Sequence, residues 1–162
     1  MFTFKLACIL LQLIVLVNCN KMAANYDDRT VFAMTVFGEA SGEIEKGQRA
    51  VAWVIINRAG SRNPKAVRDV CLAPYQFECW NNQAQIDRIN TNIKRDPKGY
   101  AKILKMTNDI LAGGNVANPI GRIKYYNNPA KGQCPAHLVG KKAKYIIGNH
   151  HFYDLESNNN EL

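Results

Sequence analysis

The sequence predicts a single, mostly helical α+β domain with a small β element late in the chain. Apolar residues recur at helical spacing in successive segments between about residues 26 and 114. Glycine, proline and helix-capping residues stand at the ends of these segments. The candidate strands are short and come after residue 120. The length of 162 residues fits one domain.

The first nineteen residues have the pattern of a secretory signal peptide. Lys5 precedes an uncharged apolar run over 6–17, and small or polar residues up to Cys19 close it. The run is shorter than the roughly 20 residues of a membrane span. We expect cleavage after Cys19 and a secreted, periplasmic or envelope domain over 20–162, with 155–162 as a disordered tail. Retention as a membrane anchor and lipidation at Cys19 are the alternatives.

The charge of the mature chain indicates an anionic partner. The whole chain carries 21 basic and 13 acidic residues, and loss of Lys5 leaves a net charge of about +7. An exported basic protein meets cell walls, glycans and membrane surfaces rather than nucleic acid. The basic residues are also scattered instead of clustered with aromatic residues, so nucleic acid is not an expected partner. We expect a monomer with no stable membrane span after signal cleavage.

Two segments predict the helices at the centre of the domain. Residues 26–40 read as a helix that Asp27 or Asp28 caps. Residues 45–60 read as a second helix that ends before Gly60. The middle of the second segment is apolar on nearly every side, which predicts a buried central helix.

The remaining elements follow in order along the chain. A short helix with a proline near its start is predicted in 63–72, and another in 83–90. The apolar spacing in 96–114 predicts a longer helix that a glycine pair ends. Residues 121–129 and 143–153 are loop and possible strand.

Export permits a disulfide, and three cysteines remain in the mature chain. They allow one bridge and one free thiol. A Cys71–Cys79 bridge closes a short loop, and Cys79–Cys134 is the other good candidate. The sequence does not choose between them.

Glu39 is the candidate catalytic acid. An acid that protonates a leaving group near neutral pH needs its pKa raised towards roughly 6, usually by apolar surroundings. Val36 and Phe37 precede Glu39, and the predicted buried helix follows it. Glu43 lies four residues on and is a candidate second carboxylate, although Gly42 interrupts the helix. Both residues as ordinary surface charges is the alternative.

Two stretches have the composition of a sugar-binding cleft. Residues 74–82 combine aromatic rings with amide side chains, as do residues 124–129. Rings stack on pyranose faces, and amides bond hydroxyl or N-acetyl groups. Core packing in the first stretch and a turn in the second are the alternatives. The candidate substrate-binding residues are Gln76, Phe77, Trp80, Tyr126 and Asn127.

The histidines give no metal motif. His150 and His151 are adjacent, His137 stands alone, and no HExxH spacing occurs. We therefore expect no metal and no cofactor. Cys–His nucleophilic catalysis would need a reduced cysteine in an exported protein, and structural histidines are the simpler interpretation.

Three segments carry a resemblance to a known family. They are VFGEASGEIEKGQRAVAWVIINR (36–58), YQFECWN (75–81) and IGNHHFY (147–153). In content and order they resemble the cell wall hydrolase family typified by the spore-cortex-lytic enzyme SleB. The resemblance runs from about Val31 to Tyr153 and is most specific in the first segment.

The resemblance implies a lysozyme-like helical fold and an exported enzyme that degrades peptidoglycan. It implies cleavage of the glycan strand between N-acetylmuramic acid and N-acetylglucosamine by lytic transglycosylation, with Glu39 as catalytic acid and Glu43 in support. The stretch 124–129 departs from the His-Tyr pair of many members, and Cys71 and Cys134 lie outside the pattern. A stem-peptide hydrolase such as N-acetylmuramoyl-L-alanine amidase, and a non-catalytic glycan-binding protein, are the alternatives.

Overall fold

The computed structural model describes residues 23–132 and 134–155. The predicted signal peptide, and all but the first residue of the predicted tail, lie outside the described residues. Within the described ranges, five α-helices are followed by a small three-stranded sheet. The predicted fold class, mostly helical with a late β element, is confirmed. No helix in the described part of the chain has the length and apolar character that crossing a bilayer requires.

Helices α2 (Asp28–Ala40) and α3 (Glu45–Ala59) form the centre of the domain, as the apolar patterns predict. The Asp27 side chain caps α2 by accepting a 2.7 Å hydrogen bond from the Thr30 amide. At the other end of the pair, α3 stops at Gly60, whose φ of 64° is left-handed. The middle of α3, from Ala50 to Ile56, is buried on every side.

The three outer helices are α4 (Pro64–Cys71), α5 (Gln83–Arg95) and α6 (Pro97–Leu111). Helix α5 continues five residues beyond the predicted end at 90. Residues 91–95 are mostly polar, so the spacing of apolar residues does not indicate a helix there. In the structure, the half-buried Ile93 packs on the core and extends the helix. Asp96 then caps α6, and Pro97 at its first position separates the two helices.

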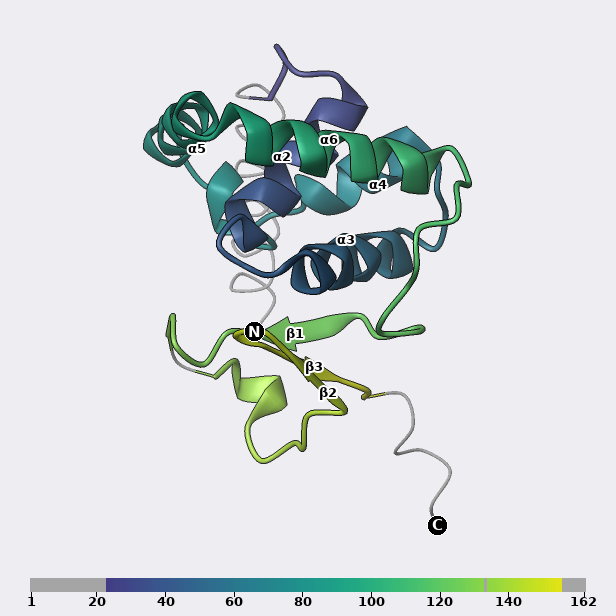
Figure 1. Cartoon of the computed structure of the whole chain (residues 1–162). Helices are drawn as coiled ribbons and strands as arrows, with labels where there is room; N and C mark the ends of the chain where they lie inside the picture. The colour runs from purple at the N-terminus through teal and green to yellow at the C-terminus, as the bar shows by residue number, and fades with distance from the viewer. Residues whose placement is uncertain (1–22, 133, 156–162) are drawn as a thin grey trace, which may run out of the picture.

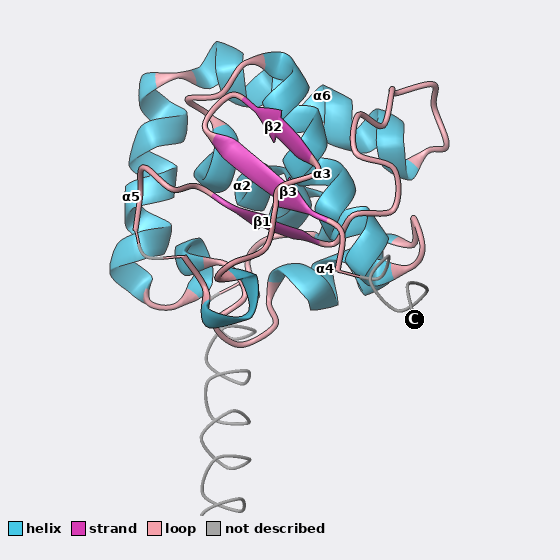
Figure 2. Ribbon diagram, turned by 90° about the horizontal axis from the view of Figure 1, so that it is seen from below, coloured by secondary structure: helices cyan, strands magenta, loops and turns pink. Residues whose placement is uncertain are grey.

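The sheet contains strands β1 (Tyr125–Asn127), β2 (Tyr145–Ile147) and β3 (His150–Tyr153), in the order β1-β3-β2 with antiparallel pairing. A two-residue turn joins β2 to β3, and its first residue, Gly148, has a φ of 59°. Figure 1 shows α3 between this sheet and the other helices. Figure 2, seen from below, shows the sheet covering one face of the helical layer.

The predicted disulfide is absent, since Cys71, Cys79 and Cys134 are all free thiols. Cys71 is buried at the end of α4, near Thr35 of α2. Cys79 is buried against a later part of α2, where it lies close to Gly38. Cys134 is exposed on the loop before the 3-10 helix η2 (Ala136–Leu138). The three thiols therefore belong to different environments, which corrects the prediction.

Candidate active site

Glu39 lies in the last turn of α2, where its carboxylate faces the sheet. Its Oε2 accepts a 3.0 Å hydrogen bond from the hydroxyl of Tyr126 on β1. Its Oε1 has no hydrogen-bond partner within the described ranges and is left available to the cleft. Burial raises the pKa of Glu39 above its usual value, against the Tyr126 hydrogen bond and the positive charge of Lys131, which lower it. A raised pKa favours the protonated acid.

The Tyr126 hydroxyl is held by the packing of its ring. The ring meets the His150 imidazole edge-on, with centroids 5.1 Å apart, and stacks on Phe152 at 5.9 Å. Tyr126 and Phe152 are also paired in the β1–β3 register. Burial, together with the nearby Glu39 carboxylate, raises the pKa of Tyr126 well above its usual value. The phenol therefore keeps its proton and acts as a fixed donor to Glu39.

Two adjacent residues of α3 anchor the chain that leads into β1. The Asn57 amide donates to the Gly121 and Ile123 carbonyls at 2.8 and 2.9 Å. The Arg58 Nε donates to the Lys124 carbonyl at 2.7 Å. These bonds fix the position from which β1 carries Tyr126 to Glu39. They also give the "NR" of the sequence pattern a structural role that sequence reasoning missed.

Glu43 holds the β2–β3 turn against the helices. Its two oxygens accept 3.0 Å hydrogen bonds from the Asn149 backbone amide and side-chain amide, and His150 Nδ1 lies 3.7 Å away. Burial opposes ionisation, yet the Asn149 hydrogen bonds and the His150 imidazole lower the pKa of Glu43. A Cβ on Gly148 would lie 2.0 Å from a Glu43 oxygen, so this carboxylate needs glycine at the turn. The Glu43 side chain is only 6% exposed. It does not line either of the two cavities that flank Glu39.

Glu39 stands between two cavities that together form one cleft. They have volumes of about 480 and 430 Å³ and share Glu39, Glu78 and Lys131 in their walls. The first cavity is rich in tyrosine and amide side chains from β1 and the loop before η1 (Glu78–Trp80). The second runs towards α5 and includes Arg88. An extended polymer can therefore lie across the acid with units on both sides.

The structure brings together only some of the predicted binding residues. Gln76, Tyr126 and Asn127 line the first cavity. Phe77 and Trp80 lie in the core instead, at 3% and 1% exposure, which corrects the expectation that their rings face a sugar.

The buried rings of Phe77 and Trp80 support residues that lie next to the cleft. Trp80 Nε1 donates a 2.8 Å hydrogen bond to the hydroxyl of Thr35 on α2. The Arg58 guanidinium lies over the Phe77 ring at 5.6 Å. One Arg58 nitrogen, Nη1, is buried without a hydrogen-bond partner while the side chain lines the first cavity.

Sequence reasoning missed two residues that the cleft exposes. Tyr75 is 62% exposed at its rim and has a φ of 58°, a left-handed backbone that is strained for a non-glycine residue. Glu78 is the second carboxylate of the cleft, the position expected for Glu43. The signal for both was their place in the 74–82 stretch, where Tyr75 precedes the buried Phe77 and Glu78 lies between Phe77 and the buried Trp80.

The two buried cysteines are poor candidates for nucleophilic catalysis. Burial raises the pKa of the Cys71 thiol to about 12 and that of the Cys79 thiol well above its usual value. A nucleophilic cysteine requires the thiolate, so both thiols are poorly suited to attack. No three His, Cys, Asp or Glu side chains in residues 23–132 and 134–155 are grouped to hold a metal ion.

Comparisons with known proteins agree with this architecture. A family model described as Cell Wall Hydrolase matches residues 42–153. The match begins three residues after Glu39 and so does not include it. The support for a catalytic role of Glu39 is therefore the site geometry and the sequence resemblance. No curated protein matches the chain.

Two solved structures are similar over most of the chain. One is the catalytic domain of the Bacillus cereus SleB protein, at 26% identity and a TM-score of 0.50, covering 78% of this chain and 89% of that chain. The other is the catalytic domain of the germination-specific lytic transglycosylase SleB from Bacillus anthracis, at 25% identity and a TM-score of 0.52. That match covers 80% of this chain and 95% of the other.

Proposed function

The chain belongs to the cell wall hydrolase family, and we propose that it is an exported lytic transglycosylase that cleaves the glycan strand of peptidoglycan. The observation that carries the proposal is the Glu39 carboxyl, whose burial raises its pKa and which lies between two cavities. Glu39 would serve as the single acid and base. The similarity to SleB catalytic domains supports the same reaction class.

In the first step, the protonated Glu39 gives its proton to the glycosidic oxygen. The bond between that oxygen and the C1 carbon of N-acetylmuramic acid breaks, and the N-acetylglucosamine side leaves as an alcohol. Oε1 would carry the transferred proton, because Oε2 accepts the hydrogen bond of the Tyr126 hydroxyl. Positive charge that develops at C1 is stabilised by the carboxylate that remains.

In the second step, the Glu39 carboxylate acts as a base. It removes the proton from the C6 hydroxyl of the same muramic acid, and the C6 oxygen bonds to C1. The product is a 1,6-anhydro ring, and Glu39 regains the proton that it lost. The Tyr126 hydrogen bond stabilises the carboxylate between the two steps, as the lowering effect of this bond on the Glu39 pKa indicates.

The direct test is mass spectrometry of fragments that the mature protein releases from purified peptidoglycan. We expect muropeptides lighter than the hydrolysed products by the mass of one water, and none from Glu39→Gln. Asp69→Asn, which changes an exposed carboxylate on α4 outside the cleft, is the matched control and should keep full activity. Circular dichroism should show that both variants fold.

Other products would refute the proposal, and each would indicate a different function. Full-mass reducing ends would mean that water is the nucleophile, and Glu78 would become the candidate second carboxylate. Free stem peptides would indicate an amidase. Binding to insoluble wall without released fragments would indicate a glycan-binding protein.

A further inference from the structure

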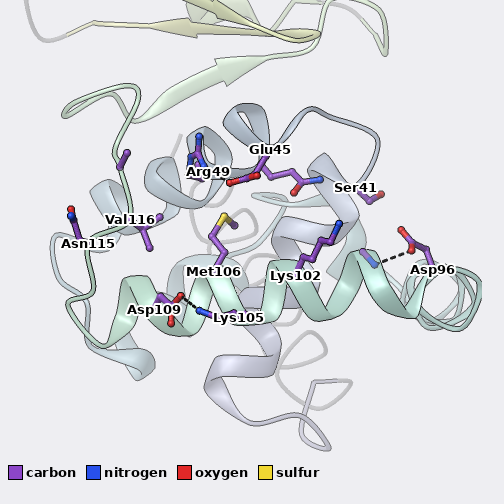
Figure 3. A pocket seen from close by; sticks show the side chains of 13 residues that line it. Ser41, Glu45, Arg49, Asp96, Lys102, Lys105, Met106, Asp109, Asn115 and Val116 are labelled. Atoms are coloured by element: carbon purple, nitrogen blue, oxygen red, sulfur yellow. Dashed lines mark hydrogen bonds and ion pairs between the residues drawn. The ribbon is translucent and has the colours of Figure 1, made fainter.

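Another cavity lies outside the Glu39 cleft, on the side of the domain that α6 forms. It has a volume of about 690 Å³ and lies between the first half of α3, helix α6 and the chain that follows α6. This volume is within the range of ligand pockets. Ser41 lines both this cavity and the α5 side of the Glu39 cleft, so the two hollows are neighbours at this residue. In Figure 3, Ser41 lies towards one end of the cavity and Asn115 at the other.

The polar lining of the cavity carries charges of both signs, from the basic residues Arg49, Lys102 and Lys105 and the acidic residues Glu45, Asp96 and Asp109. Lys105 is paired with Asp109 at 2.7 Å. Lys102 is exposed and has no ion-pair or hydrogen-bond partner in the described part of the chain. Arg49 pairs through Nη1 with Glu45, yet its Nε is buried without an acceptor. Lys102 is thus the accessible donor of this lining that fits a carboxylate group, whereas Arg49 is held by Glu45.

The floor of the cavity is apolar and suited to small side chains. Met106 rises from α6 between the two helices, and Val116 and Ala117 approach from the following chain. A thioether can adapt its shape to methyl groups. The cavity thus combines a carboxylate-binding donor, Lys102, with a surface for short apolar side chains, a combination that fits an alanine-containing peptide with carboxylate groups.

We propose that this cavity binds the stem peptide of the glycan strand whose backbone lies in the Glu39 cleft. The inference rests on the proposed function, because the stem peptide branches from the muramic acid that the acid would act upon. The peptide is joined to the sugar through its amino end, so its free groups are mainly carboxylates. At roughly 3.3 Å per extended residue, a tetrapeptide spans about 13 Å from its point of attachment. The peptide would cross from one hollow to the other beside Ser41, which lines both.

The test compares glycan strands that carry stem peptides with strands from which an amidase has removed them. The wild-type protein should cleave the peptide-bearing strands with the higher kcat/KM. Lys102→Glu should reduce the ratio of the two kcat/KM values about tenfold, because it replaces a carboxylate-binding cation with a like charge. Lys98→Glu is the matched control, since Lys98 is exposed on α6 outside the cavity, and it should keep the wild-type ratio. A wild-type ratio near one, or equal ratios in the two variants, would overturn the proposal.

A binding measurement separates this inference from the proposed function. A free stem tetrapeptide is titrated into the wild-type protein and followed by backbone amide NMR. Shifts in 102–109 and 115–117 that are lost in Lys102→Glu support the cavity, even if no glycan fragment is ever released. Shifts confined to the Glu39 cleft, or no shifts, refute it whatever the protein does to glycans.

Discussion

The hydrogen bond between Tyr126 and Glu39 allows a sharp test of the acid's role. Tyr126→Phe removes the 3.0 Å bond and keeps the ring that packs on His150 and Phe152. The bond favours the charged carboxylate and lowers the Glu39 pKa against the effect of burial. Without it, the carboxyl should hold its proton to a higher pH.

The size of the effect follows from the kind of bond that is lost. A hydrogen bond to a charged group contributes roughly 1.5–3 kcal/mol, and about 1.4 kcal/mol corresponds to one unit of pH. Activity that needs protonated Glu39 declines as the pH rises through the pKa of this group. In Tyr126→Phe this decline should move to higher pH by about one unit or more. The maximal rate should fall as well, because the carboxylate formed after proton transfer loses its stabilising donor.

The assay is the pH profile of fragment release from purified peptidoglycan. Tyr125→Phe is the matched control, because Tyr125 lies in the same cavity and makes no hydrogen bond to Glu39. Its profile should coincide with that of the wild type. An unshifted alkaline limb in Tyr126→Phe would refute the argument that this hydroxyl tunes Glu39, and a shift to lower pH would reverse its sign.

Three stability predictions concern the supports of the site. Glu43→Ala removes the acceptor of the β2–β3 turn and should cost about 1–3 kcal/mol in urea unfolding. Since the pKa of Glu43 is lowered in the fold, its contribution is complete above the unfolded pKa and should disappear as the pH falls through the folded one. Gly148→Ala should lose at least twice the roughly 1 kcal/mol expected for Gly140→Ala. Both glycines have positive φ, but only Gly148 is crowded by a carboxylate, so equal losses would contradict this account. Trp80→Phe should lower the melting temperature by a few degrees through loss of the bond to Thr35, and an unchanged temperature would count against a structural role.

Much of the helical architecture was predictable from local patterns. The caps at Asp27 and Asp96 and the stop at Gly60 set helix ends because they satisfy or release backbone groups that depend only on nearby residues. The apolar middle of α3 predicted its central position for a similar reason, since a helix with no polar face must be covered on all sides. The late β element was also visible, although its pairing was not.

The cleft was harder to predict because burial is a tertiary property. The aromatic and amide stretch at 74–82 was a reasonable sugar-binding pattern, yet Phe77 and Trp80 face the core while Tyr75 and Gln76 face the cleft. Residue type alone cannot distinguish these orientations. The predicted disulfide was wrong for a similar reason, since an oxidising compartment permits a bridge but only the packing places two thiols together.

Glu39 illustrates both what the sequence determines and what only the tertiary structure decides. The sequence by itself determined that an acid follows an apolar run at the end of a helix, and that a buried helix comes next. Only the tertiary structure decided that Tyr126, 87 positions away, donates to this acid, while Glu43 is engaged by the β2–β3 turn. The physical reason is that a pKa depends on burial and on neighbouring charges and donors in space, and here these come from strands that the chain reaches only near its end.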